Sequence, residues 1–266
     1  MRILMIGDIV GRLGRQTLQT YVPKLKSAYQ PDVIVVNAEN SANNGRGVTK
    51  EIVREFRSLG VHCLTLGNHT WGQSEIFDFI EEEEHLVRPA NYPEGTPGKG
   101  FTTLSTPKGK VTVMNLMGRS FMSPLTLDCP MKSFEKMYKQ ISAGHYILVD
   151  FHAETTSEKQ SFAWFVDGKA SAVIGTHTHV QTADERILPK GTAYLTDVGM
   201  VGPYDGIIGM DRELVIRRYL TQLPVRFEVA GGRFQLNAVL LDFDSSTKKA
   251  RRIQRIRIDE DSPWFH

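Results

Sequence analysis

Short apolar runs that alternate with helical patterns constrain the fold of this chain more than any other feature. Each run is rich in β-branched residues, and each is followed by a segment in which apolar side chains recur every three or four positions. Repeated strand–helix units of this size indicate an α/β fold whose first half pairs its strands in parallel. The predicted strands are residues 3–6, 33–36 and 61–66, and the predicted helices are residues 15–29, 50–59 and 74–84.

The second half of the chain is richer in strands. Glycine and proline punctuate residues 89–100, which we expect to form an extended surface segment. No repeat, low-complexity tract or linker interrupts the pattern, so we predict a single domain over residues 1–266. Further strands are predicted at residues 111–115, 146–151, 172–174 and 193–195. The last predicted strands are antiparallel, at residues 225–229, 233–243 and 251–258, with turns at residues 231–232 and 244–246.

The charge balance excludes some classes of partner. Thirty-two basic and thirty acidic residues leave a formal net charge of +2, which gives no electrostatic reason to expect a strong nucleic-acid footprint or a membrane-seeking surface. No apolar stretch approaches the roughly 18 residues of a membrane span, and Asp8 closes the first apolar run too early for a signal peptide. Cys63 and Cys129 lie far apart, in no metal-binding spacing. We therefore expect a cytoplasmic protein without a membrane partner, and a homo-oligomer stays open.

Polar residues collect at the carboxyl ends of the predicted strands. In open α/β sheets, ligands bind beyond these ends. Five strand ends each carry at least one oxygen or nitrogen ligand, so a single rim could hold them all. The candidate residues are Asp8, Glu39, Asn40, Asn68, His69, His152, His177 and His179.

Most of these candidates have a structural alternative. An isolated aspartate after a strand is often a helix cap, so Asp8 could cap the helix that follows it. Glu39, Asn40 and Asn68 could be turn residues. A lone histidine near apolar residues, such as His152, is more often a hydrogen-bonded core residue than a ligand.

The histidines nevertheless form a pattern that independent accidents would not produce. Four of the eight, among them His69 and His152, follow predicted strands beside carboxylate and amide groups. One residue separates His177 from His179, so in an extended segment both imidazoles would point to the same side and could serve neighbouring metal ions. The other four histidines show no such pattern, and we assign structural roles to them: His62, His85, His145 and His266.

The mixture of carboxylate, amide and imidazole groups predicts a metal site. These ligands suit first-row metals such as manganese, iron or zinc, and no thiolate is among them. Seven or eight ligands exceed the three or four that one catalytic zinc ion takes. Two metal ions, about 3.5–4 Å apart and joined by a bridging carboxylate, account for the number, and such pairs hydrolyse phosphate esters.

Five motifs resemble, in order and spacing, those of the calcineurin-like metallophosphoesterase superfamily. They are Gly7-Asp8, Glu39-Asn40, Gly67-Asn68-His69, the lone His152 and Gly175-Thr176-His177-Thr178-His179. The resemblance narrows to the bacterial YmdB-like branch and covers essentially the whole chain. The blocks that carry it are residues 37–41, 66–71, 87–92, 150–154, 175–184 and 196–206.

Two positions depart from the pattern of the broad superfamily. Its first motif is usually Asp-x-His, whereas this chain reads Asp8-Ile9-Val10, so one histidine ligand is missing and Asn40 is the natural replacement. Its bridging residue is usually an aspartate, and the matching carboxylate in this chain is Glu39. Both departures fit the YmdB-like branch.

The resemblance implies an α/β fold, a four-layer αββα sandwich of two mixed β-sheets flanked by helices. It also implies two divalent transition-metal ions, iron or manganese before zinc, with Glu39 bridging them. By match to the family pattern, one ion takes Asp8, Glu39, Asn40 and His179, and the other takes Glu39, Asn68, His152 and His177.

The activity that the resemblance implies is hydrolysis of phosphodiester bonds in small nucleotides, 2′,3′-cyclic nucleotides in particular, by a metal-bound hydroxide. His69 is not needed as a ligand and would stabilise the transition state or protonate the departing sugar oxygen; its structural alternative is a residue bonded to backbone at a helix start.

Two other functions stay open. One is a phosphomonoesterase or nucleotidase that uses the same two ions, and the other is a regulatory binding protein that keeps the metals for rigidity. The walls of the pocket rather than the ligands choose between substrates. The candidate wall residues are Arg12, Asn91, Tyr92 and Tyr204.

Overall fold

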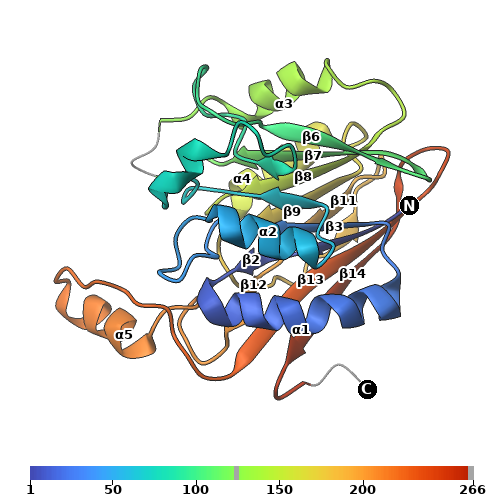
Figure 1. Cartoon of the computed structure of the whole chain (residues 1–266). Coiled ribbons are helices and arrows are strands. Elements are labelled where there is room, and N and C mark those ends of the chain that lie inside the picture. The colour runs from blue at the N-terminus through green and yellow to red at the C-terminus, as the bar shows by residue number, and fades with distance from the viewer. Residues whose placement is uncertain (123–125, 263–266) are drawn as a thin grey trace.

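Two β-sheets pack face to face and carry helices on their outer faces (Figure 1). The structure, a computed structural model, describes residues 1–122 and 126–262. Three clusters of buried hydrophobic residues fill the layers: one beneath the helices of each sheet, and one between the two sheets. The predicted four-layer αββα sandwich is therefore confirmed.

The larger sheet joins the first strands of the chain to the last ones. Its strands are β1 (Arg2–Ile6), β2 (Asp8–Ile9), β3 (Val33–Asn37), β4 (Cys63–Thr65), β5 (Leu86–Val87), β12 (Met200–Pro203), β13 (Phe234–Phe243) and β14 (Ala250–Asp259). Their spatial order is β2-β12-β13-β1-β3-β4-β5, and β14 also pairs with β13. As predicted, β1, β3 and β4 are parallel, and β5, which was not predicted, is parallel to β4; β13 is antiparallel to both β1 and β14.

The smaller sheet is built from the middle of the chain. Its strands are β6 (Phe101–Thr106), β7 (Gly109–Met117), β8 (Tyr146–His152), β9 (Ala172–Thr176), β10 (Arg186–Ile187) and β11 (Ala193–Leu195), in the spatial order β10-β11-β9-β8-β7-β6. The four central strands are parallel, and β6 and β10 are antiparallel to their neighbours. The parallel strands of each sheet therefore deliver their carboxyl ends to one edge, where polar side chains can meet.

Helices cover both outer faces. Those of the larger sheet are α1 (Gly11–Tyr29) and α2 (Lys50–Ser58), and those of the smaller sheet are α3 (Pro130–Tyr138) and α4 (Thr156–Val166). Two further elements are the 3₁₀ helix η1 (Ser74–Asp78) and the helix α5 (Arg212–Thr221). In the described part of the chain, no helix has both the length and the apolar character needed to cross a bilayer.

Helix α1 begins at Gly11, four residues before the predicted start at residue 15. The first turn packs against the larger sheet through glycine, because a Cβ atom on Gly14 would lie 2.5 Å from the carbonyl oxygen of Val201. The apolar spacing that predicts a helix cannot reveal a contact that glycine makes.

Three other expectations are wrong. The helix predicted at residues 74–84 is reduced to η1 and turns, because Gln73 makes no capping hydrogen bond and the like charges of Glu81 and Glu84 would lie one helical turn apart. The strand predicted at residues 225–229 is absent from this fully described segment, where Val229 forms an isolated bridge with Met210. The predicted surface segment at residues 89–100 is partly interior, with Asn91 and Tyr92 buried.

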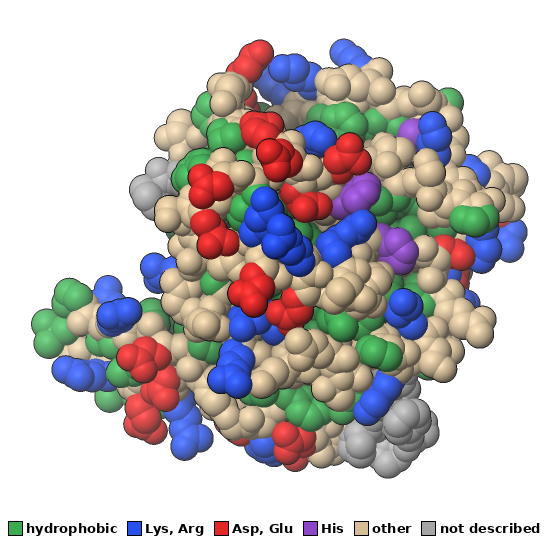
Figure 2. Space-filling model, in the orientation of Figure 1, with side chains coloured by type: hydrophobic (Ala, Val, Ile, Leu, Met, Phe, Trp, Pro, Cys, Tyr) green, Lys and Arg blue, Asp and Glu red, His purple; other side chains and the backbone are tan. Residues whose placement is uncertain are grey.

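A segment that carries α5 projects from the sandwich (Figure 1). Hydrophobic side chains are exposed on it, as Figure 2 shows, among them Tyr219, Leu220 and Leu223. Over the rest of the face in Figure 2, acidic and basic side chains are interspersed, in line with the near-neutral net charge of the chain.

Candidate active site

All eight candidate residues meet at the carboxyl ends of the parallel strands. Asp8 follows β1, Glu39 and Asn40 follow β3, and Asn68 and His69 follow β4 in the larger sheet. His152 ends β8, and His177 and His179 follow β9 in the smaller sheet. Hydrogen-bond contacts join these residues into two groups, and the contact between His152 and Glu39 connects the groups into one cluster across the two sheets.

His152 lies at the centre of the cluster and is fully buried. Its Nε2 atom is 2.8 Å from Oδ1 of Asn68, 3.2 Å from Oε1 of Glu39 and 3.0 Å from Nδ1 of His177. One ring nitrogen carries at most one proton and cannot bond to three such neighbours by hydrogen bonds alone. Lone pairs that converge in this way are typical of ligands around a cation, and Glu39, His152 and His177 form a group that could hold one.

Asp8 adds a carboxylate to the same place. It is fully buried, and its Oδ2 atom accepts a hydrogen bond of 3.2 Å from the backbone N–H of His177. Its Oδ1 atom has no hydrogen-bond partner among the described residues, which is costly for a buried carboxylate. Asp8 does not cap α1, whose N-cap is Val10 without a side-chain bond, so the structural alternative for Asp8 is excluded.

A second group of side chains gathers on the other side of Glu39. The Nδ2 atom of Asn40 lies 3.1 Å from Oε1 of Glu39 and 3.1 Å from Nε2 of His179. The Nδ1 atom of His179 lies 2.8 Å from the backbone oxygen of Ile208. A carbonyl can only accept, so the proton of this imidazole sits on Nδ1 and the lone pair of Nε2 faces the cluster, as a metal ligand requires.

The turn that holds the two neighbouring histidines is left-handed, with φ values of 99° at His177 and 64° at His179. The expectation that both lie in an extended segment is therefore wrong. Such values are uncommon for residues other than glycine and require support from surrounding bonds. Asp197 supplies it, because its Oδ2 atom accepts both the backbone N–H of Thr178 at 3.0 Å and the buried ammonium of Lys159 at 2.7 Å.

Glu39 connects the two groups. Its Oε1 atom is near both His152 and Asn40, and its Oε2 atom accepts a hydrogen bond of 3.0 Å from the backbone N–H of His69. Gly67 keeps this space open, since a Cβ atom there would lie 2.3 Å from Oε2 of Glu39 and 2.4 Å from Nε2 of His152.

The pKa values of the cluster reflect crowded charge. Burial lowers the pKa of His152, but the carboxylates of Glu39 and Asp8 outweigh it and raise the pKa to about 9. Burial and the positive charge of His152 lower the pKa of His177 to about 3. Burial raises the pKa of Asp8 well above its ordinary value. A proton on His152 thus neutralises part of the negative charge of these carboxylates, which a metal cation would neutralise more fully.

A buried network behind the cluster was not foreseen from the sequence. The Nδ1 atom of His152 lies 2.9 Å from Oγ1 of Thr176, which donates a hydrogen bond of 2.6 Å to Asp150. Thr65 and Asn37 donate to the other oxygen of Asp150. The available signal was a carboxylate inside the otherwise apolar run of β8, which only a partner on neighbouring strands can explain.

The cluster opens into a cavity of about 380 Å³. None of the four predicted wall residues lines it: Arg12, Asn91, Tyr92 and Tyr204. Asn91 supports the fold instead, because its amide bonds to the backbone oxygens of Met117 and Asp128. The walls that the sequence did not reveal are Arg46, Glu154, Ile208, Met210 and Phe227.

The remaining histidines lie elsewhere. Nδ1 of His62 accepts a hydrogen bond of 3.0 Å from the backbone N–H of Ile34, and Nδ1 of His145 lies 2.9 Å from Oγ1 of Thr112. His85 lies outside the cluster, and His266 lies outside the described residues.

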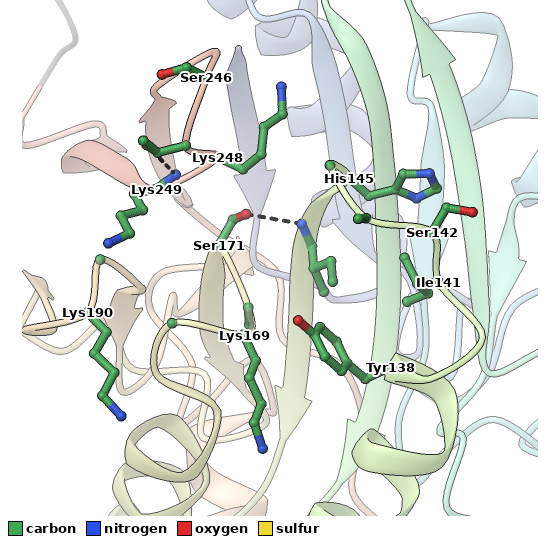
Figure 3. Close-up of a pocket in the computed structure, with 17 residues that line it drawn as sticks. Tyr138, Ile141, Ser142, His145, Lys169, Ser171, Lys190, Ser246, Lys248 and Lys249 are labelled. Carbon is green, nitrogen blue, oxygen red and sulfur yellow. Dashed lines mark hydrogen bonds between the residues drawn. The ribbon is translucent and has the colours of Figure 1, made fainter.

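A second cavity, of about 280 Å³, lies where β8 and β9 begin, at the opposite end of the smaller sheet (Figure 3). Four lysines and no carboxylate line it: Lys169, Lys190, Lys248 and Lys249. It shares no residue with the cavity over the cluster of candidate residues.

Comparison with known proteins identifies the class and the family. A solved structure of the NAD nucleotidase of Haemophilus influenzae has the same fold, with a TM-score of 0.61 at 12% identity over 97% of this chain and 56% of that one. This likeness shows the fold, and the matches of higher identity show the class, a metallophosphoesterase.

The model of the YmdB-like protein family matches residues 4–256, and the chain belongs to this family. It is 54% identical over 265 residues, the whole of both chains, to a Bacillus subtilis 2′,3′-cyclic-nucleotide 2′-phosphodiesterase. It is 38% identical to a solved Mycoplasma pneumoniae structure described as a novel phosphatase, with a TM-score of 0.93 over 99% of this chain and 95% of that one.

Proposed function

We propose that this protein hydrolyses phosphodiester bonds of small nucleotides, 2′,3′-cyclic nucleotides foremost, with the help of two divalent transition-metal ions. The observation that carries the proposal is the meeting of carboxylate, amide and imidazole groups from both sheets on one glutamate, Glu39. The full-length identity to the Bacillus subtilis enzyme supports the choice of substrate.

Glu39 would be shared by both ions. The ligands of one ion would be Asp8, Glu39, Asn40 and His179, and those of the other would be Glu39, Asn68, His152 and His177. This set of oxygen and nitrogen atoms suits iron or manganese, with zinc as the alternative. Two such ions, when bound, clamp phosphoryl oxygens and lower the pKa of a water that attacks phosphorus.

The residues of the chain prepare this site. The buried Oδ1 atom of Asp8 would gain the partner that it otherwise lacks. The carbonyl of Ile208 fixes the tautomer of His179, and Asp150 with Thr176 holds the ring of His152. Partners of this kind commonly change metal affinity or activity by 10–100-fold when they are removed.

His69 is the residue that we assign to the reaction itself. It lines the cavity, its side chain is about one-third exposed, and its Nδ1 atom is 2.7 Å from Oδ1 of Asn40. This contact leaves Nε2 as the ring nitrogen that can reach a substrate. A proton or hydrogen bond given from Nε2 would stabilise negative charge that develops on the phosphoryl group or the departing ribose oxygen.

Metal analysis together with a substrate panel tests the proposal. Freshly purified protein should contain close to two transition-metal ions per chain, and Glu39→Ala should lose more than one of them. The panel compares 2′,3′-cyclic nucleotides with nucleoside 3′- and 5′-monophosphates, and the cyclic diesters should be hydrolysed with the higher kcat/KM. Faster hydrolysis of monophosphates would instead identify a phosphomonoesterase. Full activity in metal-free protein would overturn the proposal.

A further inference from the structure

We propose that the natural substrate is the 2′,3′-cyclic phosphate at the 3′ end of an RNA strand, and that a groove beside β14 binds the strand. The inference rests on the proposed function, because it extends the substrate of the same site. In the reaction, water adds to phosphorus, the bond between phosphorus and O2′ breaks, O2′ takes up a proton, and the strand ends in a 3′-phosphate.

Three hollows lie side by side, starting over the candidate metal site, and each shares lining residues with the next. The cavity over the cluster shares His179 and Ile208 with a second hollow of about 280 Å³. This hollow is not the lysine-lined cavity, which has a similar volume but lies elsewhere. The second shares Gln181, Arg255 and Arg257 with a third, of about 460 Å³. We call the second and third hollows together the β14 groove. A groove that begins at a metal ligand can accept the part of a substrate that does not fit over the metals.

The topology explains why β14 leads away from the cluster. β14 and β1 are both antiparallel to β13, so β14 ends on the same side of the sandwich as β1, where the cluster lies. Arg257 is opposite Asn237 in the register and Arg255 is two residues back, about 7 Å along the strand. Arg252 also lines the third hollow, farther from the cluster, but its side chain lies on the opposite face of the strand. Arg255 and Arg257 therefore follow one another along one face of β14.

The groove is basic although the chain as a whole is nearly neutral. No carboxylate lines the second hollow, and the third contains three arginines and one glutamate, Glu185. Arg255 uses Nε to bond to Glu185 at 2.7 Å, and Arg257 uses Nε to bond to Asp259 at 3.0 Å. Among the described residues, the terminal nitrogens of both guanidinium groups make no hydrogen bond, and this donor fork matches a phosphate group.

The cavity over the cluster offers a place for the last nucleotide. Ile208, Met210 and Phe227 line it, and the side chains of Ile208 and Phe227 remain exposed. An aromatic ring in such a wall stacks on a base without regard to sequence, which suits an enzyme that must act on many strand ends. The cyclic phosphate requires O2′, so the strand is RNA, and its remaining nucleotides must leave the cavity on the 5′ side.

A substrate-length series with the metal-loaded protein tests this inference. It compares 2′,3′-cyclic AMP with a tetraadenylate that ends in a 2′,3′-cyclic phosphate. Charge-assisted hydrogen bonds to phosphate are strong enough that kcat/KM should be about tenfold or more higher for the tetranucleotide. In R255A/R257A the ratio between the two substrates should fall to about one. For the tetranucleotide, the slope of log kcat/KM against the logarithm of salt concentration should become less steep by about 0.7 for each lost phosphate contact.

The lysine-lined cavity supplies the matched control, because K190A/K249A removes the same charge from the opposite end of the sheet (Figure 3). This variant should keep the wild-type ratio. A ratio near one in the wild-type protein would overturn the inference while leaving the proposed function intact, and so would an equal fall in both double variants. Failure to hydrolyse either substrate would count against the proposed function itself.

Discussion

Asn40 links the predicted metal ligands to the residue that we assign to the reaction. Its Nδ2 atom faces Glu39 and His179, and its Oδ1 atom faces His69. To bind a metal ion, the amide must turn by 180° so that Oδ1 takes the place of Nδ2, an exchange that hardly changes its shape. Nδ2 would then donate a hydrogen bond to Nδ1 of His69, which leaves the proton of a neutral imidazole on Nε2.

This arrangement predicts how His69 acts. His69→Ala should keep both metal ions, because His69 is not among the predicted ligands, and its kcat should fall by about 10²–10³. The loss should be similar for a p-nitrophenyl diester and a 2′,3′-cyclic nucleotide, since a neutral donor stabilises phosphoryl charge in both. Steady-state kinetics with metal analysis of each preparation measures both quantities. A loss confined to the substrate with the ribose leaving group would instead identify His69 as a general acid. In that case the oxygen of Asn40 would still be directed at His69.

Metal uptake should depend on pH through His152. The pKa of His152 in the metal-free protein is about 9, against an ordinary value of 6.5. A raised pKa means that protonation stabilises the fold fully below pH 6.5 and that this contribution is lost as the pH rises towards 9. Binding a metal ion displaces that proton, so the apparent metal affinity should rise over the same range, by up to about tenfold per pH unit. Competition with a chelator at pH 6.5, 7.5 and 8.5 measures it, and an affinity independent of pH would contradict this assignment.

At the scale of the secondary-structure elements, the site requires that the strand ends come close together as well as that they carry ligands. Gly67 follows β4 and leaves room for Glu39 and His152. Gly67→Ala should therefore lose more than one metal ion per chain while its far-UV circular dichroism stays near that of the wild type, because the added methyl group meets movable side chains. Gly231→Ala is the matched control, since no atom lies within 4 Å of its added Cβ and its φ is not left-handed. Equal metal content in Gly67→Ala and the wild type would show that the two ligands can move apart.

The sequence predicted the strands that carry ligands because buried parallel strands are continuous apolar runs with an abrupt polar end. It could not predict the left-handed turn at His177 and His179, because tertiary bonds to Asp197 stabilise that backbone. It also missed Ile208 and Phe227, which flank α5 in a segment without regular periodicity. Ile208 and Phe227 reach the site because the segments before and after α5 both pack back against the sandwich. No local sequence pattern predicts this tertiary contact.

At the scale of the whole molecule, the candidate site joins the two sheets. Asp8, Glu39 and Asn68 come from the larger sheet, and His152 and His177 come from the smaller one. Apart from the buried network around Asp150, the layer between the sheets is held by apolar packing. Metal ions bound at this edge would therefore cross-link the two halves of the sandwich and stabilise the folded state by mass action.

Removal of the metals should accordingly lower the thermal stability of the entire fold. An ion present at 100 to 1,000 times its Kd stabilises a folded protein by about 2.7–4.1 kcal/mol, and 1 kcal/mol shifts Tm by about 2–4 °C in a chain of this size. A chelator should thus lower Tm by roughly 5–15 °C, and added Mn²⁺ should restore it. Glu39→Ala is the control: it should already lack most of the bound metal, so the chelator should change its Tm by only a few degrees. An unchanged Tm in wild-type protein from which the metals have demonstrably been removed would show that the sandwich is held by its apolar layers alone, and that the ligands from the two sheets meet without being tied together.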